Sequence, residues 1–163
     1  MQTPLKQIVW ENVTCLIVDD DKFSRTFIKT ALYQIGIKNV KEAATAKEAS
    51  EQISNFKIDI ILLDQQMPET SGIEFARKLK NNPLNNAGEI PIIMITVDTK
   101  EKTVLDAKEL GIKEYLVKPI SPLALKKRIS SAFGIKQERV YSSDLPTYFT
   151  VINFAGINRI FTC

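Results

Sequence analysis

The sequence has no histidine among its 163 residues, and this absence removes several kinds of function. Without histidine the chain can carry neither a phosphohistidine nor a histidine-based catalytic dyad, and it lacks the commonest transition-metal ligand. Its two cysteines, Cys15 and Cys163, lie far apart, and Cys15 falls within an apolar run. We therefore expect no disulfide framework, and we expect a reduced, cytoplasmic protein.

Long apolar runs and strong charge are also missing. No segment approaches the ~20 apolar residues that a membrane-spanning helix requires, and the first residues, MQTPLKQIVWENVT, lack the features of a signal peptide. Lys and Arg number 22 against 19 Asp and Glu, so the net charge of +3 is mild. No basic stripe suited to nucleic acid is visible. We expect neither membrane insertion nor direct binding to nucleic acid.

Short apolar runs do alternate with amphipathic segments along most of the chain. Apolar strands separated by helices are typical of a parallel sheet covered on both faces. The sequence therefore predicts a doubly wound α/β domain. The predicted strands cover residues 13–18, 39–44, 59–63, 91–95 and 114–117, and the predicted helices cover 22–36, 45–56, 72–80, 99–111 and 121–134.

The first predicted helix is amphipathic and ends at a glycine, Gly36. We expect its apolar face to carry four residues at four-residue spacing: Phe23, Phe27, Ala31 and Ile35. The fifth predicted helix has a capping residue, Ser121, followed by Pro122 at its first position.

Polar side chains follow four of the five predicted strands. Asp19 and Asp20 end the first strand, Asp64 the third, Thr96 the fourth and Lys118 the fifth. Because ligands of open parallel sheets bind at the carboxyl ends of the strands, we expect these groups to converge.

Two carboxylates 4 Å apart repel by about 4 kcal/mol at an effective dielectric constant of 20, and a divalent cation relieves this repulsion. Oxygen ligands without histidine or cysteine favour Mg²⁺. A lysine and a hydroxyl beside such a cation suit a phosphoryl group, with one carboxylate as the nucleophile.

Four segments together resemble a known family. CLIVDDDKFSR, ILLDQQMPETSG, IIMITVDTK and YLVKPI are similar to the receiver domain of two-component response regulators, most closely the single-domain chemotaxis type. The resemblance covers roughly residues 13–133, leaving an N-terminal extension, 1–12, and a C-terminal extension, 134–163. It implies a flavodoxin-like, five-stranded parallel sheet in the receiver order 2-1-3-4-5.

The resemblance also implies a role for each site residue. Asp64 is the phosphoacceptor, and Mg²⁺ is held by Asp20, Asp64 and the backbone carbonyl of Gln66, with Asp19 acting directly or through water. Thr96 and Lys118 contact phosphoryl oxygens, and Tyr115 is the aromatic switch, although plain packing is the alternative for a tyrosine in a strand. The remaining assignments are Asp21 as a helix cap, Gln66 and Asp98 as residues that tune the phosphate lifetime, and a cis bond between Lys118 and Pro119.

The implied function is a phosphorylation-dependent switch and not a dedicated enzyme. A partner histidine kinase or histidine phosphotransfer protein phosphorylates Asp64, and the surface formed by 99–133 changes and is read by a downstream protein. Three alternatives stay open: a phosphorelay intermediate, a scaffold that needs no phosphate, and a haloacid-dehalogenase-like phosphatase using Asp19 of the Asp19-x-Asp21 motif. The last lacks the acidic motif expected after the lysine.

The C-terminal extension is too short for a DNA-binding output domain. TYFTVINF and RIFTC, separated by AGIN, are rich in β-branched and aromatic residues and favour a hairpin. Such segments aggregate when exposed. The extension therefore either packs on its own receiver or on a partner, including a second copy in a dimer, or it is a poorly ordered end.

Overall fold

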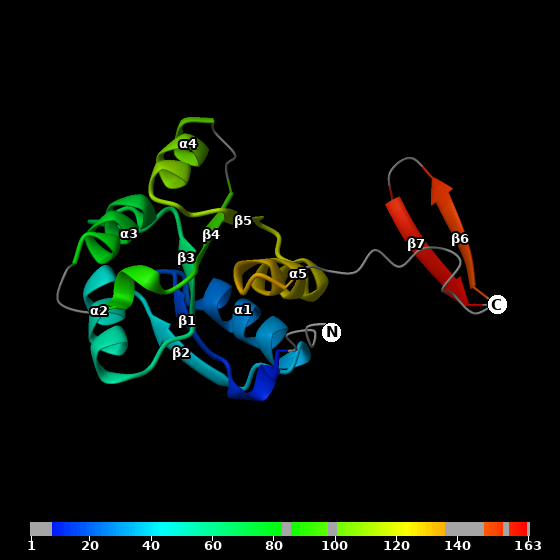
Figure 1. Ribbon diagram of the computed structural model, residues 1–163, viewed down its shortest axis with the longest axis horizontal. Coiled ribbons are helices and arrows are strands. Elements are labelled where there is room, and N and C mark those ends of the chain that lie inside the picture. The colour runs from blue at the N-terminus through cyan, green and yellow to red at the C-terminus, as the bar shows by residue number, and fades with distance from the viewer. Residues whose placement is uncertain (1–7, 83–85, 98–100, 136–148, 155–156, 163) are drawn as a thin grey trace, which may run out of the picture.

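The computed structural model describes residues 8–82, 86–97, 101–135, 149–154 and 157–162. Its main sheet has five parallel strands in the order β2-β1-β3-β4-β5 (Figure 1), as the resemblance implied. The edge strand β2 brings no predicted site residue, whereas β1, β3, β4 and β5 do. The strands are β1 (Thr14–Val18), β2 (Asn39–Ala43), β3 (Ile60–Asp64), β4 (Ile92–Thr96) and β5 (Glu114–Val117).

Helices cover both faces of the sheet, with α1 and α5 on one side and α2, α3 and α4 on the other (Figure 1). No helix in the described part of the chain is long and apolar enough to cross a membrane. The helices are α1 (Lys22–Gln34), α2 (Ala46–Asn55), α3 (Gly72–Lys80), α4 (Glu101–Glu109) and α5 (Pro122–Ala132), with 3-10 turns η1 (Trp10–Asn12) and η2 (Asn86–Glu89).

Side-chain caps fix where the helices begin, because the first backbone N–H groups of a helix have no partner within it. The Asp21 carboxylate accepts from the N–H of Phe23, which confirms its predicted capping role. Ser71 and Glu74 form a reciprocal capping box at α3. Ser121 caps α5 with Pro122 at its first position, also as predicted.

Alternation along each strand divides the core into two layers. In β1, Leu16 and Val18 pack beneath α2 and α3, whereas Cys15 and Ile17 pack beneath α1 and α5. Strand β3 is buried along its whole length, because helices cover both faces of the sheet. The polar groups that follow these strands therefore emerge from a rigid, fully packed support.

The predicted apolar face of α1 was wrong in its first half. Phe23 and Phe27 are 85% and 54% exposed, and the helix buries Ile28 and Leu32 together with the predicted Ala31. The reason is geometric: residues four apart are offset by about 40° around a helix, so a run of such spacings drifts away from one face. The two phenylalanines lie beyond the edge of the core.

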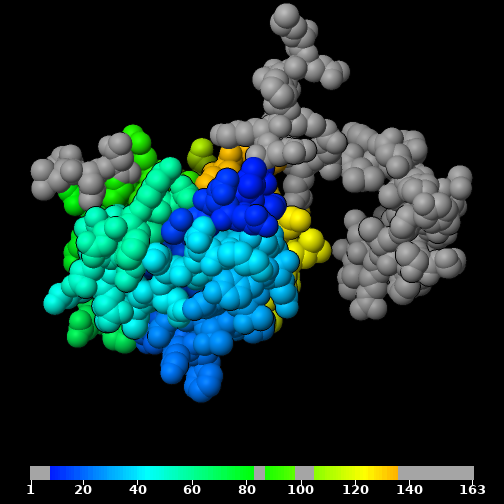
Figure 2. Space-filling model, turned by 90° about the horizontal axis from the view of Figure 1, so that it is seen from below, coloured from blue at the N-terminus to red at the C-terminus, as the bar shows by residue number. Residues whose placement is uncertain are grey.

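The structure describes a part of each extension. The first described residues lie beside the end of α5 (Figure 2), where Ile8 and Val9 share a groove with Phe133 and Ile135. The C-terminal extension contains two antiparallel strands, β6 (Phe149–Phe154) and β7 (Ile157–Thr162). What these strands pack against stays a prediction, since residues 136–148 lie outside the described ranges.

Candidate functional site

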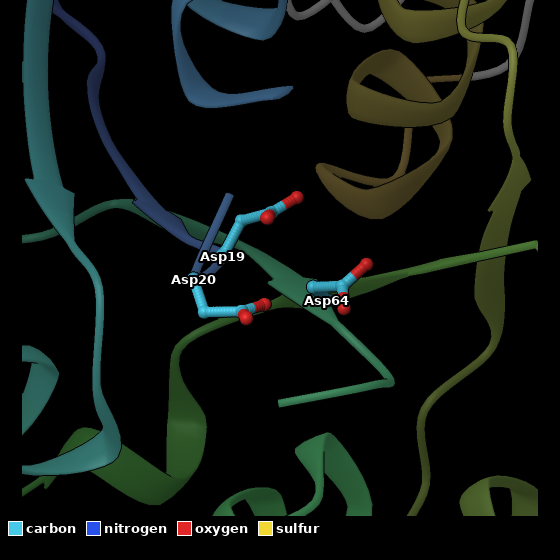
Figure 3. A group of neighbouring side chains, drawn as sticks. All are labelled: Asp19, Asp20 and Asp64. Carbon is cyan, nitrogen blue, oxygen red and sulfur yellow. The ribbon is translucent and has the colours of Figure 1, made fainter. Parts of the chain in front are cut away.

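Three carboxylates meet at the carboxyl edge of the sheet. Asp19 and Asp20 follow β1, and Asp64 is the last residue of the neighbouring strand β3 (Figure 3). One oxygen from each lies within 4.8 Å of the other two. The sequence prediction that these three groups converge is therefore correct.

Lys118, in the loop after β5, forms ion pairs with two of these carboxylates. Its ammonium group lies 2.9 Å from Oδ2 of Asp19 and 2.8 Å from Oδ1 of Asp64. The Lys118–Pro119 peptide bond is cis, as the resemblance implied, and the Lys118 N–H donates to the carbonyl of Thr96 at 2.9 Å. The loop after β5 is thus tied to the end of β4, and the lysine points at the carboxylates.

Asp19 and Asp20 differ in their surroundings although they are adjacent. Asp19 is 1% exposed; its Oδ1 accepts from the N–H of Asp21 at 2.9 Å and its Oδ2 from the hydroxyl of Ser24 at 2.6 Å. With Lys118 also bound, both Asp19 oxygens are occupied, so this side chain organises the site. Asp20 is exposed and open to a ligand.

Asp64 combines burial with two charge-stabilising contacts. It is 5% exposed, and its Oδ2 accepts from the N–H of Gln66 at 2.8 Å. Burial raises the pKa of the Asp64 carboxyl, and the Lys118 ammonium and the Gln66 N–H offset only part of that rise. For Lys118 burial lowers the pKa, but the hydrogen bonds and charges of Asp64 and Asp19 outweigh it and the pKa is raised. The lysine is therefore a permanent cation.

The loop after β3 folds back closely over its own strand. The Gly72 N–H donates to the carbonyl of Gln65 at 3.1 Å, and a Cβ at Gly72 would lie only 2.3 Å from the carbonyl oxygen of Asp64. Glu69 takes the left-handed conformation with φ of 66°. Only glycine fits at position 72 without a shift of the backbone, because any side chain would displace the backbone of Asp64.

The donor set fits a magnesium ion. All three side chains offer carboxylate oxygens, and Mg²⁺ takes one or two carboxylates with the remaining positions filled by water or substrate oxygens. Opposite ligands around Mg²⁺ lie about 4.2 Å apart, since each bond is about 2.1 Å long. The three carboxylate oxygens lie within 4.8 Å of one another and are therefore near enough to hold one ion together.

Comparison with known proteins identifies the family. The family profile described as "Response regulator receiver domain" matches residues 15–130. The chain belongs to the receiver domains of response regulators. It is 35% identical over 120 residues to chemotaxis protein CheY1 of Helicobacter pylori, which covers 73% of this chain and 95% of that protein. It is also 41% identical over 118 residues to the phosphate regulon transcriptional regulatory protein PhoB of Pseudomonas aeruginosa, of which it covers 50%.

Solved structures show the same fold. Chemotaxis protein CheY4 of Vibrio cholerae matches with a TM-score of 0.68 at 28% identity, covering 74% of this chain and 98% of that one. The chain is thus a receiver similar to the chemotaxis type, and its family consists of signalling proteins of two-component systems and not of dedicated enzymes.

Two further receiver positions lie on adjacent strands. Thr96, the last residue of β4, is 6% exposed, and Tyr115 of β5 is partly buried against the layer that contains α3 and α4. The register pairs Tyr115 with Met94 and Val117 with Thr96, so Tyr115 and Thr96 are on the same face of the sheet. Asp98 falls outside the described residues.

Two residues in the first turn of α1 contact the acidic loop and were not predicted from the sequence. Besides the hydroxyl of Ser24 on Asp19, the guanidinium of Arg25 donates to the backbone carbonyls of Asp19 and Asp20 at 2.7 and 3.1 Å. Neither residue stands out in a single sequence, because a serine and an arginine in the first turn of a helix are usually solvated. Only the fold brings them back over the preceding loop.

Proposed function

We propose that this receiver is a switch that accepts a phosphoryl group on Asp64 from a partner protein. The observation that carries the proposal is the position of Asp64 between the Lys118 ammonium and the carboxylates of Asp19 and Asp20. An oxygen of Asp64 forms the bond to phosphorus while the bond to the donor nitrogen breaks, and that nitrogen keeps the electron pair. The donor histidine lies outside these 163 residues, since they contain none.

Asp64 suits the nucleophile better than Asp19 does. The Asp19 carboxylate accepts from three donors, the Asp21 N–H, the Ser24 hydroxyl and the Lys118 ammonium, and the residue is 1% exposed. The Asp64 carboxylate has two partners, Lys118 and the Gln66 N–H, so it has fewer contacts to release before it attacks phosphorus. Membership of the receiver family also counts against the phosphatase alternative, which needed Asp19 as the nucleophile.

The residues that would hold Mg²⁺ are Asp20, Asp64 and the backbone carbonyl of Gln66, with Asp19 anchoring the site. When bound, Mg²⁺ neutralises the charge of the phosphoryl group. Lys118, already 2.8 Å from Asp64, then contacts a phosphoryl oxygen and supplies a second positive charge.

The switch itself involves Thr96 and Tyr115. The Thr96 hydroxyl moves to a phosphoryl oxygen, and Tyr115 turns into the space beside it, on the face of the sheet that both residues share. Because Tyr115 packs in the layer that contains α3 and α4, this movement alters the surface built from α4, β5 and α5. A downstream protein binds that surface in one of its two states. We expect the phosphoryl transfer to take place in the cytoplasm.

An apolar groove of about 410 Å³ lies directly beside Lys118 and offers a docking place for the phosphodonor. It adjoins the acidic site, because Ser24 and Lys118 line it and both bind Asp19. Exposed apolar patches of this kind mark protein-binding surfaces. A protein that presents a phosphohistidine next to Asp64 would cover this groove. Its apolar lining consists of Phe23, Phe27, Ile28, Pro119 and Ile120.

The direct test is labelling with a small donor. The purified chain is incubated with acetyl phosphate and Mg²⁺, and the modified residue is mapped by mass spectrometry after borohydride reduction. Asp64→Asn should lose the label, whereas Asp59→Asn, at the other end of the same strand region, should keep it. If the Asp64→Asn protein is modified as readily as the wild type, the proposal is wrong, and a label on Asp19 would favour the phosphatase.

A further inference from the structure

Arg25 holds the backbone of both aspartates that follow β1. Its Nη1 donates to the carbonyl of Asp19 at 2.7 Å and to that of Asp20 at 3.1 Å. The Asp19 N–H in turn donates to the carbonyl of Ala43 in β2 at 3.1 Å. The acidic loop is thus fixed through its peptide groups, separately from the contacts that hold the Asp19 carboxylate.

Arg25 is itself anchored from its outer side. Its Nε lies 3.5 Å from Oε2 of Glu42 in β2, and the other oxygen of Glu42 accepts from Lys29 at 2.7 Å. The Arg25 side chain is 15% exposed. A guanidinium with a carboxylate on one side and two carbonyl oxygens on the other has little freedom to move.

Asp20 depends on this anchoring more than Asp19 does. The Asp19 carboxylate has three partners of its own, from Asp21, Ser24 and Lys118. In the ranges that the structure describes, no hydrogen bond holds the Asp20 carboxylate, and the side chain is exposed. That carboxylate is therefore positioned through the backbone of Asp20 and not through contacts of its own, and Arg25 binds this backbone at its carbonyl oxygen.

We infer that Arg25 is a positioning residue that sets the Asp20 carboxylate for the cation of the acidic site. The inference rests on the proposed function, because it assumes that Asp20 is a magnesium ligand. Partners one step removed from a metal typically change its affinity by about 10- to 100-fold when they are lost. We expect the lower end of that range, about tenfold, because Arg25 acts on a backbone carbonyl and not on the ligand oxygen.

The measurement is the Mg²⁺ dissociation constant of the full chain by calorimetry at fixed ionic strength. Arg25→Met should weaken binding about tenfold, and Arg25→Lys should weaken it similarly, because lysine keeps the charge but is too short for both carbonyls. Lys29→Met is the matched control: it removes a positive charge one turn further along α1, without any contact to the acidic loop, and should leave the constant within about twofold.

The outcomes separate positioning from charge and from stability. A residue that only stabilises the fold would lower the urea midpoint and leave the Mg²⁺ constant of the folded protein unchanged, and this result would overturn the inference. Tighter binding in both Arg25→Met and Lys29→Met would show that the charge acts as a simple repulsion, and would overturn it too. Should Arg25→Met fail to fold, Glu42→Gln, which loosens the outer anchor, is measured in its place and must weaken binding.

If the wild type binds Mg²⁺ and is labelled on Asp64 while the Arg25 variants bind equally well, only this inference fails. A wild type without Mg²⁺ binding or label means that the proposed function fails.

Discussion

The Lys118 ammonium lies 2.8 Å from Oδ1 of Asp64, although strand β4 separates the strands from which the two residues come. The contact is made from the loop after β5, which contains the cis Lys118–Pro119 peptide bond. In this position one cation occupies oxygens that Mg²⁺ would also use. In the proposed function, Lys118 is both a competitor of the metal and a second source of positive charge for a phosphoryl group.

Replacing this lysine should have opposite effects on metal binding and on phosphorylation. Lys118→Met removes a charge a few ångströms from the metal position. We expect Mg²⁺ to bind roughly tenfold more tightly, because screening leaves only a small part of the repulsion, which is about 8 kcal/mol between a divalent and a single charge 4 Å apart at an effective dielectric constant of 20. Labelling by acetyl phosphate should fall, since the phosphoryl charge loses a partner. Calorimetry and labelling of one preparation test both.

Lys57→Met serves as the control for that experiment. Lys57 is 92% exposed and pairs loosely with Asp59, 3.9 Å away, at the opposite end of β3. Neither the Mg²⁺ constant nor the labelling should change. Weaker Mg²⁺ binding in Lys118→Met would contradict the idea of competition.

The groove beside Lys118 predicts a difference between protein and small-molecule donors. Phe27→Ser should slow phosphoryl transfer from a phosphohistidine protein at least tenfold, because a buried aromatic at the centre of an interface commonly contributes 2 kcal/mol or more. Labelling by acetyl phosphate should stay at the wild-type rate, since acetyl phosphate needs no docking surface. Val9→Ser, a similarly exposed apolar residue at the other end of the domain, is the control. Equal slowing with both donors would argue against docking at this groove.

Much of this receiver follows from its sequence for identifiable reasons. Apolar strands and strand-end polar residues such as Asp64 and Lys118 are local signals, and the rule that ligands bind at the carboxyl edge brings them together. The exposure of Phe23 and Phe27 on α1 could not be predicted from the sequence. Both side chains are as apolar as core residues, and only the fold shows that they lie outside the core. The hydrogen bonds from Arg25 to the carbonyls of Asp19 and Asp20 depend on how the chain turns back between β1 and α1, and no pattern of residue spacing predicts that turn.

The ion pairs around Glu42 predict a pH dependence of stability. The hydrogen bond from Lys29 is the main cause that lowers the pKa of Glu42 below its ordinary value, and Arg25 adds to it. A lowered pKa means that the stabilisation is present above the ordinary carboxyl pKa, near 4.3, and is lost as the pH falls through the lowered value. Glu42→Gln should therefore cost about 0.5–1 kcal/mol at pH 7 and almost nothing near pH 2. Urea unfolding at both pH values measures the difference, and an equal cost at both would contradict the ion-pair explanation.

Burial of Cys15 predicts an unreactive thiol. The residue is fully buried in the layer beneath α1 and α5, and burial strongly raises the pKa of its thiol, so the reactive thiolate is absent. In a Cys163→Ser variant, a thiol reagent such as dithionitrobenzoate should react only after the protein is unfolded in urea. Rapid reaction of the native variant would mean that β1 is exposed to solvent.

Gly72 provides a test in which the usual effect of a substitution is reversed. Alanine in place of glycine within a helix normally stabilises a protein by about 0.5–1 kcal/mol. Here the new Cβ would lie 2.3 Å from the Asp64 carbonyl oxygen, so we expect Gly72→Ala to destabilise the protein by about 1–3 kcal/mol. Because the Asp64 backbone has to move, Mg²⁺ affinity and acetyl phosphate labelling should fall as well.

The control is Gly111→Ala. A Cβ at position 111 meets no atom within 4 Å, but the residue has a φ of +74°. It should also lose about 1–2 kcal/mol of stability, through backbone strain alone, while its folded form binds Mg²⁺ and accepts phosphate like the wild type. Equal loss of Mg²⁺ binding in both variants would mean that the close approach of Gly72 to Asp64 has no special role in the site.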